Sequence, residues 1–144
     1  TQLMEAARHG HLSVVKALLE QGATVDTTNS GGKTALHIAA CKGHRDVVSC
    51  LLQGGADCRI SDVYGRNALM TAAAQGHAGV VRLLLEHVRK QPWRINRPDG
   101  SDFTALGLAV REGHADVCEA LVMEGGADFR DDTAIGPAQM SFSQ

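Results

Sequence analysis

The sequence predicts an all-α solenoid of stacked helix-turn-helix units, and two observations lead to this prediction. The first is a Gly-His pair that recurs at steps of 33, 33 and 37 residues: Gly10-His11, Gly43-His44, Gly76-His77 and Gly113-His114. The second is a set of apolar columns in the same register, such as Leu18, Leu51, Leu84 and Leu121. A fixed period of this length is the signature of a stacked repeat protein.

The second unit shows why each element is expected to form. Thr34 is a candidate N-cap, because its hydroxyl can accept a hydrogen bond from a free amide in the first helical turn. Leucine and small alanines follow on one helical face, and Gly43 is expected to end this helix because glycine tolerates the left-handed cap conformation. A second helix is expected over residues 45–53, and the turn-rich residues 56–66 lead to the next cap.

A helix, a turn, a second helix and a projecting loop at this period resemble the ankyrin repeat. The residues that carry the resemblance in the second unit are Gly32 to Ala40, Gly43-His44, Val47-Val48, Leu51-Leu52 and Gly55-Ala56-Asp57. The sequence departs from the family pattern at two positions. The usual Pro after the capping residue is replaced in every repeat, by Gln2, Ala35, Ala68 and Ala105, and the usual His of the first helix is retained only as His37. Alanine is a good helix former, so the expected fold is unchanged.

The resemblance implies one domain over residues 1–144, with β-hairpin or loop fingers projecting from the helices. Repeats are expected over residues 1–31, 32–64, 65–101 and 102–135, with a partial fifth unit over 136–144. Terminal repeats normally carry polar caps, and neither end of the sequence has a convincing one. We therefore expect a monomeric domain within a larger chain, or ends that flanking residues shield.

Composition and charge exclude several classes of protein. The formal net charge of −2 argues against a general nucleic-acid binder, and no apolar run is long enough for a membrane-spanning helix. The cysteines form no CxxC pair: Cys41, Cys50, Cys58 and Cys118. Reduced, packed thiols are the expected state, which favours the cytoplasm or the nucleus.

No residue pattern predicts a metal site, a cofactor or catalysis. Four of the seven histidines belong to the repeated Gly-His pairs, and the resemblance implies that they fix the turn by hydrogen bonding to the backbone. No pair of His or Cys has the short spacing of a zinc site, and there is no nucleophile elbow or phosphate loop. Cys41 is the thiol expected on an exposed face, and no base is identified for it. A non-enzymatic protein is expected.

The resemblance also implies that partners dock on the concave side, on finger tips and on exposed positions of the first helices. We name this set the concave face, and it comprises Arg8, His9, Lys33, Cys41, Lys42, Val63, Tyr64, Arg66, Gln75, Phe103, Arg111 and Glu112. These columns vary between repeats, whereas the core columns do not.

The concave face is expected to carry a net positive charge. Five of its members are Lys or Arg, and Glu112 is its one acid. Because Arg pairs well with carboxylates and aromatic side chains supply contact area, a partner segment with acidic residues around an apolar anchor is expected. Arg66→Glu is expected to change binding and to leave thermal melting nearly untouched.

A basic insertion in the third unit leaves two interpretations open. Four extra residues lie within residues 89–96, and the second helix is expected to extend by a turn and stop before Pro92. Trp93 either covers the lengthened helix end or forms a secondary contact with a partner. The residues of that contact would be Arg89, Lys90, Trp93 and Arg94.

The leading hypothesis is a protein-interaction module, the targeting or scaffold part of a larger protein. One alternative is a stand-alone inhibitor of a kinase or another signalling protein, similar to the ankyrin inhibitors of cyclin-dependent kinases; the full-length first helix expected over residues 35–42 counts against it. A second is nucleic-acid or anionic-surface binding through basic residues. A third is a small aromatic cage of Tyr64 and Phe103 for a histone tail.

Overall fold

A computed structural model describes residues 1–88 and 95–125 of the chain, and it confirms the predicted all-α solenoid. The described residues form helices and connecting turns, with no strand among them. The helices are α1 (Gln2–His9), α2 (Leu12–Glu20), α3 (Ala35–Lys42), α4 (Arg45–Gln53), α5 (Ala68–Gln75), α6 (Ala78–Val88), α7 (Ala105–Glu112) and α8 (Ala115–Met123).

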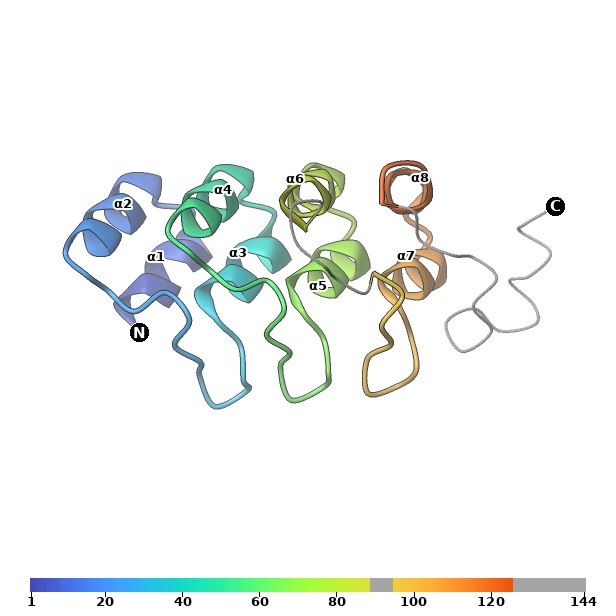
Figure 1. The fold of residues 1–144 in the computed structure, drawn as a ribbon, viewed down its shortest axis with the longest axis horizontal. Coiled ribbons are helices and arrows are strands. Elements are labelled where there is room, and N and C mark those ends of the chain that lie inside the picture. Colours follow the sequence, from blue (N-terminus) through green and yellow to red (C-terminus); the bar gives the residue numbers. More distant parts are fainter. Residues whose placement is uncertain (89–94, 126–144) are drawn as a thin grey trace, which may run out of the picture.

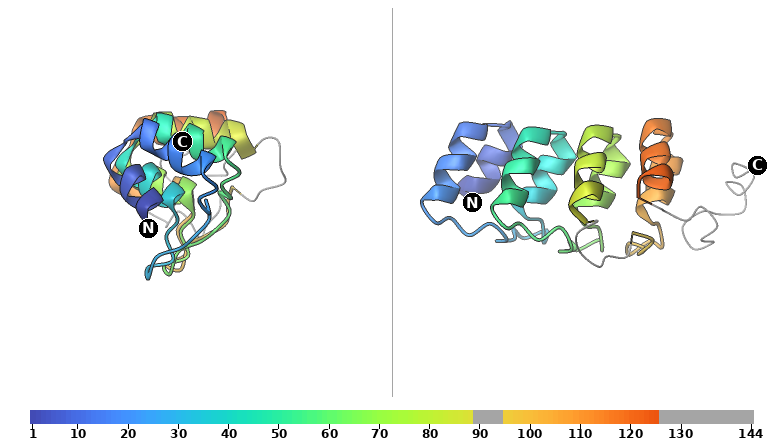
Figure 2. Two further views of the ribbon diagram at one scale, coloured as in Figure 1. Left: turned by 90° about the vertical axis from the view of Figure 1, so that its left-hand side faces the viewer. Right: turned by 45° about the horizontal axis from the view of Figure 1, so that its top comes forward.

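The helices lie in two rows with the fingers on one side (Figure 1). The odd-numbered helices α1, α3, α5 and α7 form the row nearer the fingers, and the even-numbered helices form the other row. Each odd helix packs against the next odd helix and against the even helix of its own repeat. Viewed along the stack, the fingers project away from both rows, so each repeat has the outline of an L (Figure 2).

Each first helix begins and ends as its residues predict. The Thr34 hydroxyl accepts a hydrogen bond from the amide of His37 at 3.3 Å, and Gly43 ends α3 in the left-handed conformation with φ 78°. Thr1, Asn67 and Thr104 cap α1, α5 and α7 in the same way. Because caps and stops are local interactions, the same residue types place each helix at the same point of its repeat.

The core is a thin layer between the two rows. Alanines of the odd helices let the rows approach closely, and Ala39 and Ala40 are fully buried. The facing side chains come from the even helices, where Val47, Val48 and Leu51 are also fully buried. Each repeat therefore contributes a strip of core that its neighbours complete, as in other stacked repeat proteins.

The even helices follow the prediction, including a longer second helix in repeat three. The helix predicted over residues 45–53 is α4, with those bounds, whereas α6 has eleven residues and ends at Val88. Pro92, which was expected to stop α6, lies outside the described residues. The predicted fifth unit over residues 136–144, and the end of repeat four from residue 126, lie outside them too. No helix of the described ranges is long and apolar enough to cross a membrane.

Candidate partner-binding face

The structure places the residues of the concave face at two levels of the stack, and none of them is buried. One level is the last turn of the odd helices, with Arg8, His9, Cys41, Lys42, Gln75, Arg111 and Glu112. The other level is the fingers, with Lys33, Val63, Tyr64, Arg66 and Phe103. Val63 and Tyr64 are the most exposed apolar side chains of this face, at 64% and 66%.

Each finger is closed by one side chain that the sequence analysis missed. In the first finger, the side-chain oxygen Oδ1 of Asn29 accepts hydrogen bonds from the amides of Gly31 and Lys33, at 2.9 and 3.0 Å. In the second, Oδ1 of Asp62 accepts from the amides of Tyr64 and Arg66, at 2.9 and 3.0 Å. The fingers are therefore tight turns rather than paired strands.

The third finger repeats this turn. Oδ1 of Asp99 accepts hydrogen bonds from the amides of Ser101 and Phe103, at 2.8 and 3.0 Å. Asp99 follows Asp62 by the same 37-residue step that separates the Gly-His pairs of these repeats. The recurrence of Asn or Asp at this position is the signal that could have predicted the turn, because these side chains bond their own backbone two residues on.

Backbone hydrogen bonds join the fingers to one another. The amide of Val63 donates to the carbonyl of Gly31 at 3.1 Å, and the amide of Gly100 donates to the carbonyl of Tyr64 at 2.8 Å. Each finger is thus fixed both by its own side-chain turn and by its neighbour. The tip that carries Val63 and Tyr64 is held at both sides.

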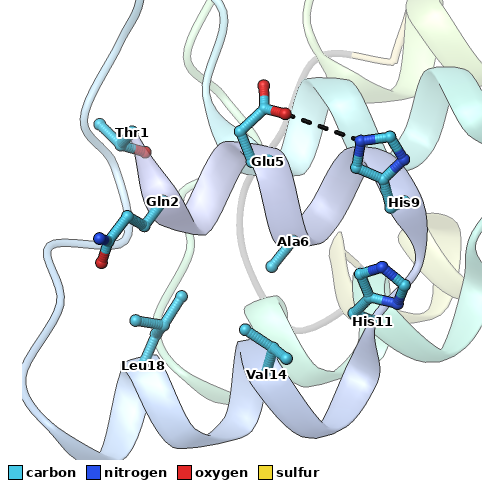
Figure 3. Close-up of a pocket in the computed structure, with 8 residues that line it drawn as sticks. All are labelled: Thr1, Gln2, Glu5, Ala6, His9, His11, Val14 and Leu18. Atoms are coloured by element: carbon cyan, nitrogen blue, oxygen red, sulfur yellow. Dashed lines mark ion pairs between the residues drawn. The ribbon is translucent and has the colours of Figure 1, made fainter.

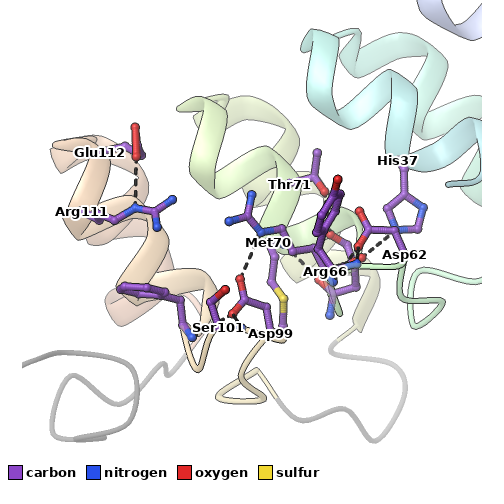
Figure 4. Close-up of polar contacts among 12 residues, drawn as sticks. His37, Asp62, Arg66, Met70, Thr71, Asp99, Ser101, Arg111 and Glu112 are labelled. Atoms are coloured by element: carbon purple, nitrogen blue, oxygen red, sulfur yellow. Dashed lines mark hydrogen bonds and ion pairs between the residues drawn. The ribbon is translucent and has the colours of Figure 1, made fainter. Parts of the chain in front are cut away.

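Arg66 lies between two fingers rather than free on the surface. Its Nε donates to Oδ2 of Asp99 at 3.1 Å, and their side chains are 29% and 1% exposed (Figure 4). A carboxylate this buried needs a charged or hydrogen-bonded partner. This contact leads us to replace the expectation that Arg66→Glu leaves melting nearly untouched with an expected loss of stability, because the guanidinium compensates a buried charge.

His37 links α3 to the second finger. Its Nδ1 accepts a hydrogen bond from the amide of Thr34 at 3.1 Å, so the proton is on Nε2, which donates to the carbonyl of Arg66 at 3.0 Å (Figure 4). Burial lowers the pKa of His37 below its ordinary value of 6.5, with smaller opposing contributions from the Arg66 carbonyl and the charge of Asp62. The neutral ring thus serves as a fixed joint between two repeats.

Several cations of the concave face already have acidic neighbours. Arg8 lies 3.6 Å from Glu5, and Arg111 lies 3.2 Å from Glu112 while its guanidinium sits 4.8 Å above the ring of Phe103. Glu112 is the one acid predicted for this face, and the structure adds Glu5 and Asp99 beside its cations. The face is less positive than predicted.

The two lysines of repeat two differ from these arginines because they have no acidic partner among the described residues. Lys33 and Lys42 lie at opposite ends of α3, and neither makes an ion pair with the residues that the structure describes. Lys33 is half-buried at the base of the first finger, and Lys42 is exposed in the last turn of the helix.

Three of the four repeat histidines bond the backbone, and each does so across repeats. Nε2 of His44 donates to the carbonyl of Arg8 at 3.0 Å, and Nε2 of His77 donates to the carbonyl of Cys41 at 2.8 Å. His114 bonds the carbonyl of Ala74 in the same way, at 3.0 Å. The implied role of fixing the turn is thus refined, because each ring ties its turn to the preceding odd helix.

A shallow hollow lies between α1 and α2, at their end of the stack (Figure 3). Glu5 and His9 approach to 3.6 Å on its α1 side, and the ring of His9 stacks on that of His11 with centroids 5.8 Å apart. Val14 and Leu18 form its α2 side. The hollow shares only His9 with the concave face.

The described residues hold no group of three or more His, Cys, Asp or Glu side chains arranged to bind a metal ion. All four cysteines lie in the described ranges and are free thiols. Cys58 and Cys118 are buried, and burial raises the pKa of both thiols, which disfavours the reactive thiolate. Cys41 is half-buried, and its own backbone carbonyl accepts the hydrogen bond from His77.

The possible secondary contact lies outside the described residues, since Arg89, Lys90, Trp93 and Arg94 all fall within residues 89–94. The described part of the insertion begins at Ile95, which packs against the core. Arg97 donates from Nη1 to the hydroxyl of Ser61 at 2.9 Å, so this cation also contacts the preceding finger segment.

Comparison with known proteins agrees with this geometry. A family model described as ankyrin repeats (3 copies) matches residues 1–62 and 54–133, which is most of the chain. No curated protein matches the sequence.

Proposed function

Because this chain belongs to the ankyrin-repeat family, whose repeats are protein-interaction modules, we propose that its concave face binds an extended segment of a partner protein. The observation that carries the proposal is the tip of the second finger. Val63 and Tyr64 are exposed there, yet their backbone is fixed by the Asp62 turn and by hydrogen bonds to both neighbouring fingers.

A fixed, exposed apolar tip suits binding for a physical reason. Association costs the conformational freedom of the groups that it orders, so a surface whose backbone is already ordered loses less on binding. Tyrosine adds a large contact area with a polar end, and it is enriched among the residues that dominate binding energy. The partner contributes an apolar anchor for this tip and acidic side chains for the cations around it.

The proposed role is that of a non-enzymatic targeting or scaffold domain without a cofactor. The four free thiols favour a reducing compartment, the cytoplasm or the nucleus. A stand-alone inhibitor with a shortened helix in its second repeat is disfavoured, because α3 has eight residues, as many as α1, α5 and α7. Nucleic-acid binding is disfavoured because Arg8, Arg66 and Arg111 each lie beside a carboxylate.

The test is an affinity pull-down from cell lysate with three baits. One is the unmodified chain, and the second is Val63→Ser/Tyr64→Ser. The third is a matched control, Val14→Ser/Met123→Ser, which removes two exposed apolar side chains from α2 and α8. We expect partners bound by the unmodified chain to be lost with the finger variant and retained by the control. Partners that behave in the opposite way would move the site to the even helices.

A further inference from the structure

We propose that the partner's acidic side chains are received by Lys33 and Lys42, so that repeat two is the acid-recognising part of the concave face. This inference rests on the proposed function and deepens it. The partner segment would place carboxylates along α3 and its apolar anchor on the neighbouring tip, Val63 and Tyr64.

The cations of the concave face differ in how strongly they can attract a further carboxylate. The guanidinium of Arg66 is held by Asp99, whose side chain is 1% exposed. A carboxylate brought to this site would meet the charge of Asp99 as well as that of Arg66. The attraction of the cation is then largely cancelled by the neighbouring anion.

Arg8 and Arg111 are less firmly paired, but their surroundings also weaken their attraction for a further carboxylate. Each lies within 3.6 Å of an exposed glutamate, and Arg111 is also stacked on Phe103. Exposed pairs of this kind are weak and can exchange partners. An incoming carboxylate would still have to compete with Glu5 or Glu112 at short range.

Lys33 and Lys42 meet no such competition from an ion pair within the described parts of the chain. At the position equivalent to Lys42, the neighbouring repeats carry His9 and Gln75, and neither is acidic. Asp62 is an acid of the same region, since its charge and that of Lys33 both act on the pKa of His37, in opposite directions. The Asp62 carboxylate is buried, and its Oδ1 already accepts two finger amides.

The two lysines and the Val63-Tyr64 tip also follow one another in an order that a single extended segment could contact. Lys42 is at the far end of α3, Lys33 is at its start, and the amide of Val63 bonds the finger that leads to Lys33. Nine residues of mostly helical rise separate the lysines by about 13 Å along the axis. An extended segment advances roughly 3.3 Å per residue, so its two carboxylates would lie about four residues apart.

The experiment uses a phage-displayed library of random 16-residue peptides, selected on the unmodified chain. Dissociation constants of the enriched peptides are then measured by fluorescence polarisation. We expect those peptides to carry at least two Asp or Glu beside an aromatic or aliphatic residue. Lys33→Glu/Lys42→Glu is expected to weaken binding at least tenfold. Circular dichroism melting of each variant confirms that the fold is intact.

The matched control is Lys16→Glu/Arg45→Glu. It changes the net charge by the same amount at two exposed cations of α2 and α4. This variant is expected to bind within about twofold of the unmodified chain. As a rescue, peptides whose acids are replaced by lysine should bind the Lys33→Glu/Lys42→Glu variant better than the unmodified chain.

The outcomes separate this inference from the proposed function. Equal losses with both charge variants would indicate a general effect of net charge and would overturn the inference. If neutral peptides are enriched, and only Val63→Ser/Tyr64→Ser abolishes their binding, the concave face binds but the role of the lysines is wrong. If no peptide is enriched, or if the finger variant also binds normally, both proposals fail.

Discussion

At the scale of single residues, Arg66 shows that a cation in a variable column can belong to the stack. Its variation between repeats, with Lys33 and Phe103 at the equivalent positions, suggested a binding role. Its contact with Asp99, 33 residues away, instead joins two fingers through a buried carboxylate. Exposure of a position therefore has to be judged together with the charge that lies beneath it.

This contact makes a prediction about stability. Arg66→Glu would remove the positively charged partner of the Asp99 carboxylate and place a second negative charge beside it, so we expect a loss of about 2–4 kcal/mol in the free energy of unfolding. Arg111→Glu, at an exposed ion pair, is expected to cost less than about 1 kcal/mol. Urea unfolding of both variants would measure the difference. Similar losses in the two variants would contradict the role assigned to Arg66.

His37 predicts a dependence of stability on pH. Its pKa is lowered in the folded protein from 6.5 by burial, so below pH 6.5 the unfolded chain binds a proton that the folded chain resists. Stability from this residue is complete above pH 6.5 and is lost as the pH falls towards the lower folded pKa. The melting temperature should therefore decrease as the pH is lowered from about 7.5 to about 5.

The matched variant is His37→Met, which copies Met70, the residue at the same position of repeat three. Met70 is buried at that position, so the methionine has a precedent in the same stack. The variant retains the other six histidines, and its melting temperature should fall less over the same pH range than that of the unmodified chain. Parallel curves for the two proteins would show that His37 contributes nothing to the pH dependence.

At the scale of elements, helix bounds could be predicted from the sequence where their determinants are local. The bounds expected for residues 35–42 and 45–53 are those of α3 and α4. Thr34 and Gly43 act within one turn of their own positions, so their spacing alone places the helix.

The fingers could be predicted only in part. Asn29, Asp62 and Asp99 fix all three turns, and their recurrence was present in the sequence but was not recognised. The hydrogen bonds from one finger to the next join residues whose spatial order depends on how the repeats stack. The pairing of Arg66 with Asp99 depends on the same stacking, so the period alone could not reveal it.

The glycine of one Gly-His pair lies against the histidine ring of the next pair along the stack. The glycines of these pairs can therefore be compared with one another. Gly43 and Gly113 both end an odd helix with φ near 78°. A Cβ on Gly43 would lie 2.6 Å from the ring of His77, whereas a Cβ on Gly113 would meet no atom of the described residues within 4 Å. The left-handed conformation is the same at the two positions, and only the neighbouring ring differs.

We therefore expect Gly43→Ala to destabilise the fold more than Gly113→Ala. Both variants carry the cost of about 1 kcal/mol for alanine in the left-handed region, and Gly43→Ala also displaces His77 from its 2.8 Å hydrogen bond to Cys41. The additional loss should be about 1–2 kcal/mol. Thermal and urea unfolding would test this, and equal losses would indicate that the ring contact carries no stability.

At the scale of the whole molecule, the columns of the repeat diverge at the α1–α2 end. The position of Gln2 is Ala35 and Ala68 in the next two repeats, and Glu5 stands where α3 has Ile38. The α1 side of this end is polar, as a terminal cap would be, whereas α2 retains the apolar residues of an internal repeat.

This divergence gives two valines of one column different surroundings. Val14 in α2 is 46% exposed, whereas Val47 in α4 is 0% exposed. Val47→Ala would remove two buried methyl groups and leave a cavity between stacked repeats, which should cost about 2–3 kcal/mol. Val14→Ala should cost less than about 0.5 kcal/mol.

The two valine variants can be compared by urea unfolding under identical conditions, with the m-value checked so that the difference reports stability alone. Because stability in a stacked protein is a sum of repeats and of the contacts between neighbours, a cavity at Val47 weakens an interface that both sides of the stack need. The solvent-facing side of α2 contributes to no such interface in the described structure. A loss from Val14→Ala as large as that from Val47→Ala would mean that the α2 side is covered in solution.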